Sequence, residues 1–496
     1  MRKKFLTNLA LLLFLNLLVK PFWIFGIDRT VQNIVGDVDY GFYFTVFNFA
    51  FLFNILLDLG ITSFNNRNIA QNQQLLNKHF SSILILKLLL FLLYTSFTFL
   101  VAWAIGYSAD HFKILGWIAF NNFLLSFITY LRSNVSGLLM LRTDSVLSVL
   151  DRLLMIAICS ILIWGNVTSE PFRIEWFIYA QTAAYSVTLL IALWIVIRKA
   201  SFRKLNWNRP FFLMILKQSF PFAIMVLLMA VYNKVDSVFI ERLLPGETGY
   251  QQSGIFAKAY RLLDAANQLA LLFGVLLLPI YSRMIKQKER IDQMVRLPFD
   301  IMISVAVIAS IGSYFFRYEI MELLYPQRPD ELLTGYLLRI KQSGKIFGLI
   351  MFGFIGTCLM YVFSTLLTAN KNLKQLNITA AFGIVINFTL NILLVPRYQA
   401  FGAAIANFST LIFTGIAYML LVQYFFRFRV NVPYLARLAA YFILVWLSGW
   451  TSVKLPFHWI NQLLFMVVVS LVFALLLKLL NINGFIKIIK STEEIS

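Results

Sequence analysis

Long apolar segments alternate with short polar ones along nearly the whole of this 496-residue chain. A helix needs about 20 predominantly apolar residues to cross the hydrocarbon core of a bilayer. With breaks taken at charged residues, glycine, proline and asparagine, the pattern predicts fourteen such helices, at residues 5–26, 40–63, 80–105, 112–131, 146–165, 175–197, 212–240, 253–282, 299–316, 343–368, 374–395, 401–425, 434–452 and 458–480. The expected fold class is all-α: a polytopic membrane protein of about 14 transmembrane helices.

Composition supports the membrane assignment. Hydrophobic residues make up 60% of the chain and charged residues 13%, whereas a soluble domain has about 45–50% apolar and about 25% charged residues. The two cysteines each lie inside an apolar run, and the three histidines are far apart, so the spacing predicts no metal site. No glycine-rich loop precedes a Lys-Ser/Thr pair, so no ATPase is predicted, and we expect no cofactor.

The formal net charge of +21 has a topological explanation that does not require nucleic acid. Cations gather in alternate loops, near residues 2–4, 67–78, 132–142, 198–209, 283–296, 371–374, 427–437 and 478–490. The intervening loops hold more acids, near residues 28–39, 170–175, 241–247 and 319–331. The positive-inside rule then places both termini in the cytoplasm. The basic start resembles a signal peptide but lacks a small-residue cleavage site, so a retained first helix is expected.

An internal repeat is suggested by two similar segments. Residues 36–43 (GDVDYGFY) join the first two predicted helices, and residues 246–256 (GETGYQQSGIF) join the seventh and eighth. Repeats of this kind are typical of transporters that work by alternating access, with the substrate held between the halves. The predicted organisation is an N-terminal lobe at 1–200, a basic cytoplasmic linker at 201–211, a C-terminal lobe at 212–425, and two further helices with a cytoplasmic tail at 426–496.

Several motifs carry a resemblance to a known family. The clearest is the sequence TANKN at 368–372, followed by NFTLNILLVPRY at 387–398 and GAAIA at 402–406. YGFY at 40–43, DLG at 58–60 and GIFAKAYR at 254–261 fit the same pattern. Over roughly residues 20–425 the chain resembles the polysaccharide flippases (Wzx-type O-antigen and exopolysaccharide flippases) of the multidrug/oligosaccharidyl-lipid/polysaccharide exporter superfamily. It departs from them at KVDS, 234–237, where many relatives place an arginine directly after the aspartate and this chain has a serine.

The resemblance implies a V-shaped bundle of two six-helix lobes around a central cavity. It also implies a function: moving an undecaprenyl-diphosphate-linked oligosaccharide from the cytoplasmic to the outer leaflet of the bacterial inner membrane, for polysaccharide biosynthesis. The expected partners are that lipid-linked glycan, membrane lipid and a polysaccharide polymerase machinery.

Cations within the predicted helices are the candidates for binding a diphosphate, because ionisable side chains are costly inside a bilayer. The candidates for a cationic cavity are Lys20, Lys87, Lys234, Lys258 and Arg261. Lys20 and Lys234 fall near matching positions of the two repeats, and a diphosphate could be held from both. Lys87 is expected to reach the cytoplasmic surface or to meet the diphosphate on entry. The alternative for each is that it snorkels to the nearer interface, which is favoured for Lys345.

Intramembrane acids have two interpretations. Asp58, Asp236 and Asp264 could pair with nearby cations, as Asp151 could with the adjacent Arg152, or one could carry a coupled proton or sodium ion. Asn387 and Asn391, four residues apart on one predicted helix, fit interhelical hydrogen bonding as well as sugar contacts.

Three other functions remain open at this stage. A membrane glycosyltransferase or polymerase would use acids such as Asp37 and Asp39 in the first outer loop, but the longest outer segment, 317–342, leaves no room for a soluble catalytic domain. A multidrug exporter of the same superfamily would favour an acidic or aromatic cavity. A lipid II flippase cannot be separated by residue chemistry. We expect a transporter and not an enzyme.

Overall fold

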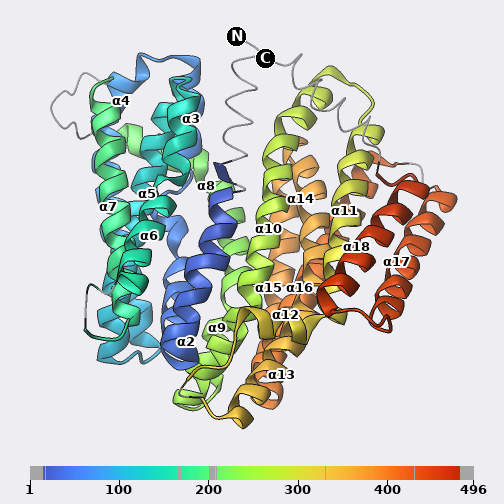
Figure 1. Ribbon diagram of the computed structural model, residues 1–496. Coiled ribbons are helices and arrows are strands. Elements are labelled where there is room, and N and C mark those ends of the chain that lie inside the picture. Colours follow the sequence, from blue (N-terminus) through green and yellow to red (C-terminus); the bar gives the residue numbers. More distant parts are fainter. Residues whose placement is uncertain are drawn as a thin grey trace. The chain divides into compact units, whose positions relative to one another are not determined.

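The computed structural model describes residues 15–16, 18–165, 167, 169–199, 207, 209–329, 331–428 and 431–480. Every regular element in these residues is a helix, and none of them forms a strand (Figure 1). The predicted all-α class is confirmed. The basic start, most of the predicted linker (201–206 and 208) and the tail from residue 481 lie outside the described residues.

The chain divides into two compact units, Met1–Val238 and Phe239–Ser496. The elements of unit 1 are η1 (Trp23–Asp28), α2 (Arg29–Leu52), η2 (Asn54–Leu57), α3 (Ile61–Gln71), α4 (Leu75–Ala104), α5 (Ala109–Gly137), α6 (Leu141–Trp164), α7 (Ile174–Ile197) and α8 (Arg209–Lys234). Helix α8 packs against α2 and α3. Helix α9 (Asp236–Leu243) contains the boundary between the units. The lobe boundaries predicted from the sequence remain a prediction.

The elements of unit 2 follow α9: α10 (Glu247–Gln287), α11 (Asp292–Phe315), α12 (Arg317–Leu324), α13 (Leu333–Ile350), α14 (Gly353–Ala369), α15 (Leu373–Tyr398), α16 (Ala400–Phe426), α17 (Val432–Ser452) and α18 (Trp459–Leu476). The predicted outer segment 317–342 is therefore not a simple loop, because it contains α12 and the first half of α13.

Ten spans within the described residues are long and apolar enough to cross a membrane by length and composition, and they include α4 to α7, α11 and α13 to α18. Residues 333–369 count as one of these spans, although two consecutive helices form it. The other predicted spans fall on helical residues short of this criterion, the first of them described only from residue 15. The protein is a multi-pass membrane protein.

The connection between the first two predicted helices is tighter than the sequence indicates. Instead of a loop over residues 27–39, helical residues continue through π-helix η1 and α2, and the only break is at Gly36 (φ 83°, ψ 177°). Such a backbone conformation is open to glycine and strongly disfavoured for other residues. Asp28 before the break accepts a hydrogen bond from the hydroxyl of Tyr40 after it, at 2.9 Å, and Asp37 is buried. Asp28 and Asp37 are thus buried in packed helix, whereas Asp39 is exposed as the predicted outer loop would have it.

Helices α17 and α18 are held on unit 2 by α11. Their shared core contains Ile311 on α11, Val445 on α17 and Met466 on α18, all fully buried. A polar contact reinforces the seam: the hydroxyl of Tyr434 on α17 donates to the carboxylate of Asp300 on α11. The two C-terminal helices are thus an integral part of unit 2.

Candidate functional site

Lys20 belongs to a group of charged residues in unit 1. It lies in the helical residues just before η1, is half-buried, and is within electrostatic reach of Arg152, Asp151 and Arg132. The packing of η1 against α6 brings the group together. The guanidinium carbon of Arg152 lies 5.6 Å from the ring centroid of Trp23. We call Lys20, Arg132, Asp144, Asp151 and Arg152 the Lys20 cluster.

The carboxylates of this cluster do not neutralise its cations. Arg132 donates through Nε to Asp144 at 2.8 Å, and Nε of Arg152 lies 3.6 Å from Asp151. These two pairs leave the ammonium of Lys20 as a third cation, so the cluster carries one net positive charge. A positive charge that no carboxylate balances in a low-dielectric region favours an incoming anion. Arg132 was not predicted from the sequence to belong to this group, because the cluster forms between different helices and not along a single helix.

Lys87 has a different environment from the one expected. Its side chain is 1% exposed, so the expectation that it reaches the cytoplasmic surface is wrong. Its ammonium donates to Asp58 Oδ1 at 2.5 Å, to the Leu57 carbonyl at 3.0 Å and to Ser126 Oγ at 3.0 Å. An ammonium has three donors, and here each has an oxygen partner. Contact between Lys87 and a substrate stays a prediction. In this conformation the ammonium has no N–H group left to donate to a substrate.

A break between helices creates the partners of Lys87. After α2 the chain forms the short 3₁₀ helix η2, and Leu59 and Gly60 have φ of 44° and 82°. A 3₁₀ turn at a break leaves backbone carbonyls outside the α-helical ladder. The Leu57 carbonyl is accordingly available to the Lys87 ammonium. The Asp58 carboxylate additionally accepts from the Thr62 hydroxyl at the start of α3.

Lys234 and Asp236 lie where α8 ends and α9 begins. Lys234 is half-buried, Asp236 is 1% exposed, and both take part in interactions within the chain. Both belong to unit 1, as Lys20 does. We expected Lys20 and Lys234 to hold a diphosphate from the two repeats. Both residues lie in the same compact unit.

The candidate cations of unit 2 lie on α10. Lys258 is 2% exposed, and its ammonium lies 5.2 Å from the ring centroid of Tyr325, whose hydroxyl donates to the Lys258 carbonyl at 3.3 Å. Arg261, three residues further on, is half-buried, and its Nη1 lies 3.8 Å from Asp264 Oδ2. At 3.8 Å this is a loose pair. The described residues contain no cluster of acids, histidines and cysteines that could hold a metal ion.

Asn387 and Asn391 pair with each other. Both are fully buried on α15, and Nδ2 of Asn391 donates to Oδ1 of Asn387 at 3.1 Å. This bond lies within one helix, so it is not the interhelical hydrogen bonding that was expected, but at 0% exposure neither side chain reaches a surface where sugar could bind.

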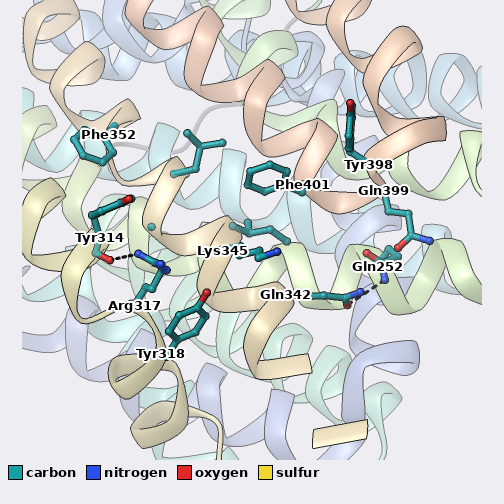
Figure 2. A pocket seen from close by; sticks show the side chains of 13 residues that line it. Gln252, Tyr314, Arg317, Tyr318, Gln342, Lys345, Phe352, Tyr398, Gln399 and Phe401 are labelled. Atoms are coloured by element: carbon teal, nitrogen blue, oxygen red, sulfur yellow. Dashed lines mark hydrogen bonds between the residues drawn. The ribbon is translucent and has the colours of Figure 1, made fainter. Parts of the chain in front are cut away.

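A cavity of about 590 Å³ in unit 2 adds residues that the sequence did not single out (Figure 2). It lies between α10, α11, α12, α13, the α13–α14 junction and the α15–α16 turn. Lys345 lines it, as do Arg317 and three tyrosines. Arg317 was missed because it follows an apolar run and looks like an ordinary residue at a helix end.

Comparisons with known proteins agree on family and fold. The family described as polysaccharide biosynthesis protein matches residues 6–285, more than half of the chain. A comparison with curated protein sequences gives no significant match. Several solved membrane transporters share the fold, all at low sequence identity.

The lipid II flippase MurJ, in an inward closed conformation, is 14% identical with a TM-score of 0.68, over 92% of this chain and 97% of that one. A mutant of the MATE transporter VcmN from Vibrio cholerae is 14% identical with a TM-score of 0.60, over 85% and 98%. A MOP superfamily transporter from Pyrococcus furiosus is 14% identical with a TM-score of 0.54, over 86% and 94%.

Structural similarity at 14% sequence identity establishes the fold of the chain. The substrate has to be argued from the site. The family match is independent of it and confirms the resemblance found in the sequence motifs. The chain has the fold of MOP-superfamily transporters and belongs to the polysaccharide biosynthesis protein family.

Proposed function

We propose that the protein flips a polyprenyl-diphosphate-linked oligosaccharide from the cytoplasmic to the outer leaflet of a bacterial inner membrane by alternating access. The observation that carries the proposal is the match to the polysaccharide biosynthesis family in a chain with a transporter fold. O-antigen and exopolysaccharide precursors are the glycans in view, with a polymerase machinery acting on the product. Both termini are assigned to the cytoplasm from the distribution of cations between loops.

The charges of unit 1 suit such a substrate. A diphosphate cannot cross hydrocarbon without cations close by, and the Lys20 cluster carries one positive charge in excess of its carboxylates. Arginine forms fork-like pairs with phosphate oxygens, while lysine acts as a compact charge. Lys20 and the arginines of the cluster are therefore assigned to the diphosphate, with Lys234, Lys258 and Arg261 as further candidates along its path.

A lipid II flippase is the second candidate, favoured by the fold of MurJ. Both substrates are diphosphate lipids, so the same cations would serve either. A multidrug exporter would need a cavity that accepts cations, which the excess positive charge of the Lys20 cluster opposes. A glycosyltransferase would use Asp37 and Asp39, of which Asp37 is only 5% exposed and Asp39 is exposed, so the transporter fold is what disfavours this function.

The test is a flipping assay with the purified protein in liposomes. A fluorescent polyprenyl-diphosphate oligosaccharide is placed in both leaflets, and a membrane-impermeant reagent reports the fraction exposed outside. We expect the protected half to become accessible with the protein present and not with a heat-inactivated sample. Movement of lipid II together with no movement of the oligosaccharide would select the second candidate, and turnover of a sugar donor would overturn the proposal.

A further inference from the structure

The cavity of unit 2 combines features of a saccharide site with two cations (Figure 2). Its volume of about 590 Å³ lies within the range of small-molecule pockets, about 300–1,000 Å³. Lys345 on α13 and Arg317 at the start of α12 both line it. No aspartate or glutamate is among its lining residues. The lining therefore contributes two positive charges and no negative one.

Neither cation is neutralised by the described part of the chain. Lys345 is exposed and makes no ion pair or hydrogen bond with any described residue. Arg317 donates through Nη1 to the Tyr314 carbonyl at 2.6 Å, and its guanidinium carbon lies 4.8 Å and 4.7 Å from the ring centroids of Tyr314 and Tyr318. These contacts fix the guanidinium in place and leave most of its five donors for a ligand.

The remaining lining groups suit sugar hydroxyls and sugar faces. The hydroxyls of Tyr314, Tyr318 and Tyr398 have no hydrogen-bond partner among the described residues. Gln252 and Gln342 face each other, with Nε2 of Gln252 donating to Oε1 of Gln342 at 3.4 Å, so the amide N–H groups of Gln342 are left for a ligand. Aromatic rings offer apolar faces to the C–H groups of a sugar, and their hydroxyls and the amides bind its polar edge.

The position of the cavity within unit 2 follows from the topology. Its residues come from the starts of α10, α12 and α16, the second half of α13 and the ends of α11 and α15. The cation-rich connections of this unit, which fall in residues 283–296 and 371–374, join the opposite ends of α10 with α11 and of α14 with α15 (Figure 1). Since cation-rich turns face the cytoplasm, the cavity opens at the outer end of unit 2.

We propose that this cavity binds an acidic saccharide, a sugar unit bearing a carboxylate, on the outer side of the membrane. Lys345 and Arg317 hold the carboxylate, the tyrosine rings carry the sugar faces, and Gln342 binds hydroxyls. That this saccharide is part of the transported glycan rests on the proposed function, whereas the binding chemistry does not. The site would favour acidic over neutral glycans, because a neutral sugar leaves both cations without an anionic partner.

The test is direct binding to the full-length protein in lipid nanodiscs, measured by calorimetry. The probes are a hyaluronan tetrasaccharide, which carries carboxylates, and chitotetraose as the neutral counterpart; glycerophosphoglycerol represents a lipid headgroup. We expect the acidic probe to bind at least tenfold more tightly than the neutral one, since a hydrogen bond to a charged group is worth about 1.5–3 kcal/mol.

Variants locate the site. Lys345→Gln should weaken binding of the acidic probe about tenfold, and Lys345→Arg should retain it. The matched control is Lys341→Gln, an exposed lysine one turn away on α13 that does not line the cavity, and it should bind as the parent does. Arg317→Gln should also weaken binding, and its melting curve shows whether loss of the tyrosine contacts has affected the fold.

The outcomes separate this site from the proposed function. Absence of binding by the acidic probe, equal affinity for both sugars, or an equal loss in Lys341→Gln would overturn the saccharide site. Tighter binding of glycerophosphoglycerol, lost in Lys345→Gln, would overturn it in favour of a lipid headgroup. A protein that flips its lipid substrate but binds neither sugar refutes the cavity proposal alone. A protein that binds the acidic probe but flips no lipid substrate refutes the proposed flippase function alone.

Discussion

The ammonium of Lys87 lies 2.5 Å from Oδ1 of Asp58, across the break that separates α2 from α3. The lysine is almost fully buried and the aspartate about a quarter exposed. This pair joins α4 to a segment that has no continuous helical hydrogen bonding of its own. It therefore stabilises the break together with Ser126, which also donates to the Leu57 carbonyl, and Thr62, which also donates to the Asp58 carboxylate.

Replacing Lys87 by methionine should destabilise unit 1 more than a surface change does. Removing one partner of a buried ion pair leaves an uncompensated charge and costs about 3 kcal/mol or more. Thermal unfolding in detergent, followed by circular dichroism, is the measurement, with the exposed Lys113→Met as control. The double variant Lys87→Met/Asp58→Asn should lose less than the sum of the two single changes. Strict additivity would contradict the pairing.

Neutralising Lys20 should reduce glycan export at normal protein levels. Lys20→Gln removes the charge that the carboxylates of its cluster leave unbalanced, so a loss of about tenfold or more in flipping rate is expected. The same result is predicted for Lys234→Gln and Arg261→Gln. Lys20→Arg should keep most of the activity, and Lys288→Gln, in an exposed turn, should be indistinguishable from the parent. Full export by all three neutral variants would end the assignment of these cations to the diphosphate.

Acid should weaken the attachment of the 325–332 segment to α13. Arg339 donates to Glu331 through Nε at 2.8 Å and Nη2 at 2.7 Å, and Nη2 also reaches the Pro326 carbonyl at 3.2 Å. Burial alone would raise the pKa of Glu331, but the hydrogen bonds and charge of Arg339, with a smaller contribution from Arg328, outweigh it and lower the pKa below the ordinary value. The folded chain therefore holds this proton less tightly than the unfolded chain.

The direction of the pH effect follows. With the folded pKa below the unfolded one, the stabilisation is complete above the ordinary glutamate pKa of about 4.3 and is lost as pH falls through the folded value. Proteolysis of the 325–332 segment should accelerate over that interval. Glu331→Gln should be cleaved readily at neutral pH and lose the acid dependence. The exposed pair Glu170–Arg173 offers a control, Glu170→Gln, for which no such change is expected.

Loss of the Tyr434 hydroxyl should loosen α17. Tyr434→Phe keeps the ring over which the Arg296 guanidinium lies, at 4.0 Å from its centroid, but leaves the buried Asp300 carboxylate without this donor. A cost of about 1–3 kcal/mol is expected for an unsatisfied buried group, read as a lower melting temperature. Tyr424→Phe, on a side chain that is 74% exposed, is the control. Equal melting temperatures for the two variants would show that the hydroxyl contributes nothing.

The helices were predictable because their signal is local. A run of apolar residues specifies a span regardless of what packs against it, and the described residues of each predicted range are mostly helical, with interruptions such as those at 58–60 and 351–352. The break at Gly36 was not predictable in this way. Polar residues such as Asp37 indicate a solvated loop in the sequence, but here tertiary packing buries them in helix.

The candidate site was predictable only in part. Lys20, Lys87 and Lys258 were identified because charged residues are rare within apolar runs. This criterion could not distinguish a cation that is neutralised by a carboxylate of the protein from one that is not. That distinction depends on Ser126 and Leu57 for Lys87, and on Asp144 and Asp151 for the Lys20 cluster. Except for Asp151, which is adjacent to Arg152, those partners come from other helices than the cation that they contact, so their proximity is a property of packing that residue spacing does not encode.

The hydrogen bond from Tyr40 to Asp28 crosses the one-residue break at Gly36. While this hydrogen bond is formed, it restrains the two helical segments on either side of Gly36 to one relative orientation. Bending at the glycine therefore requires the hydrogen bond to break first. Any motion of the first span against the second is thereby tied to what happens to one phenol and one carboxylate.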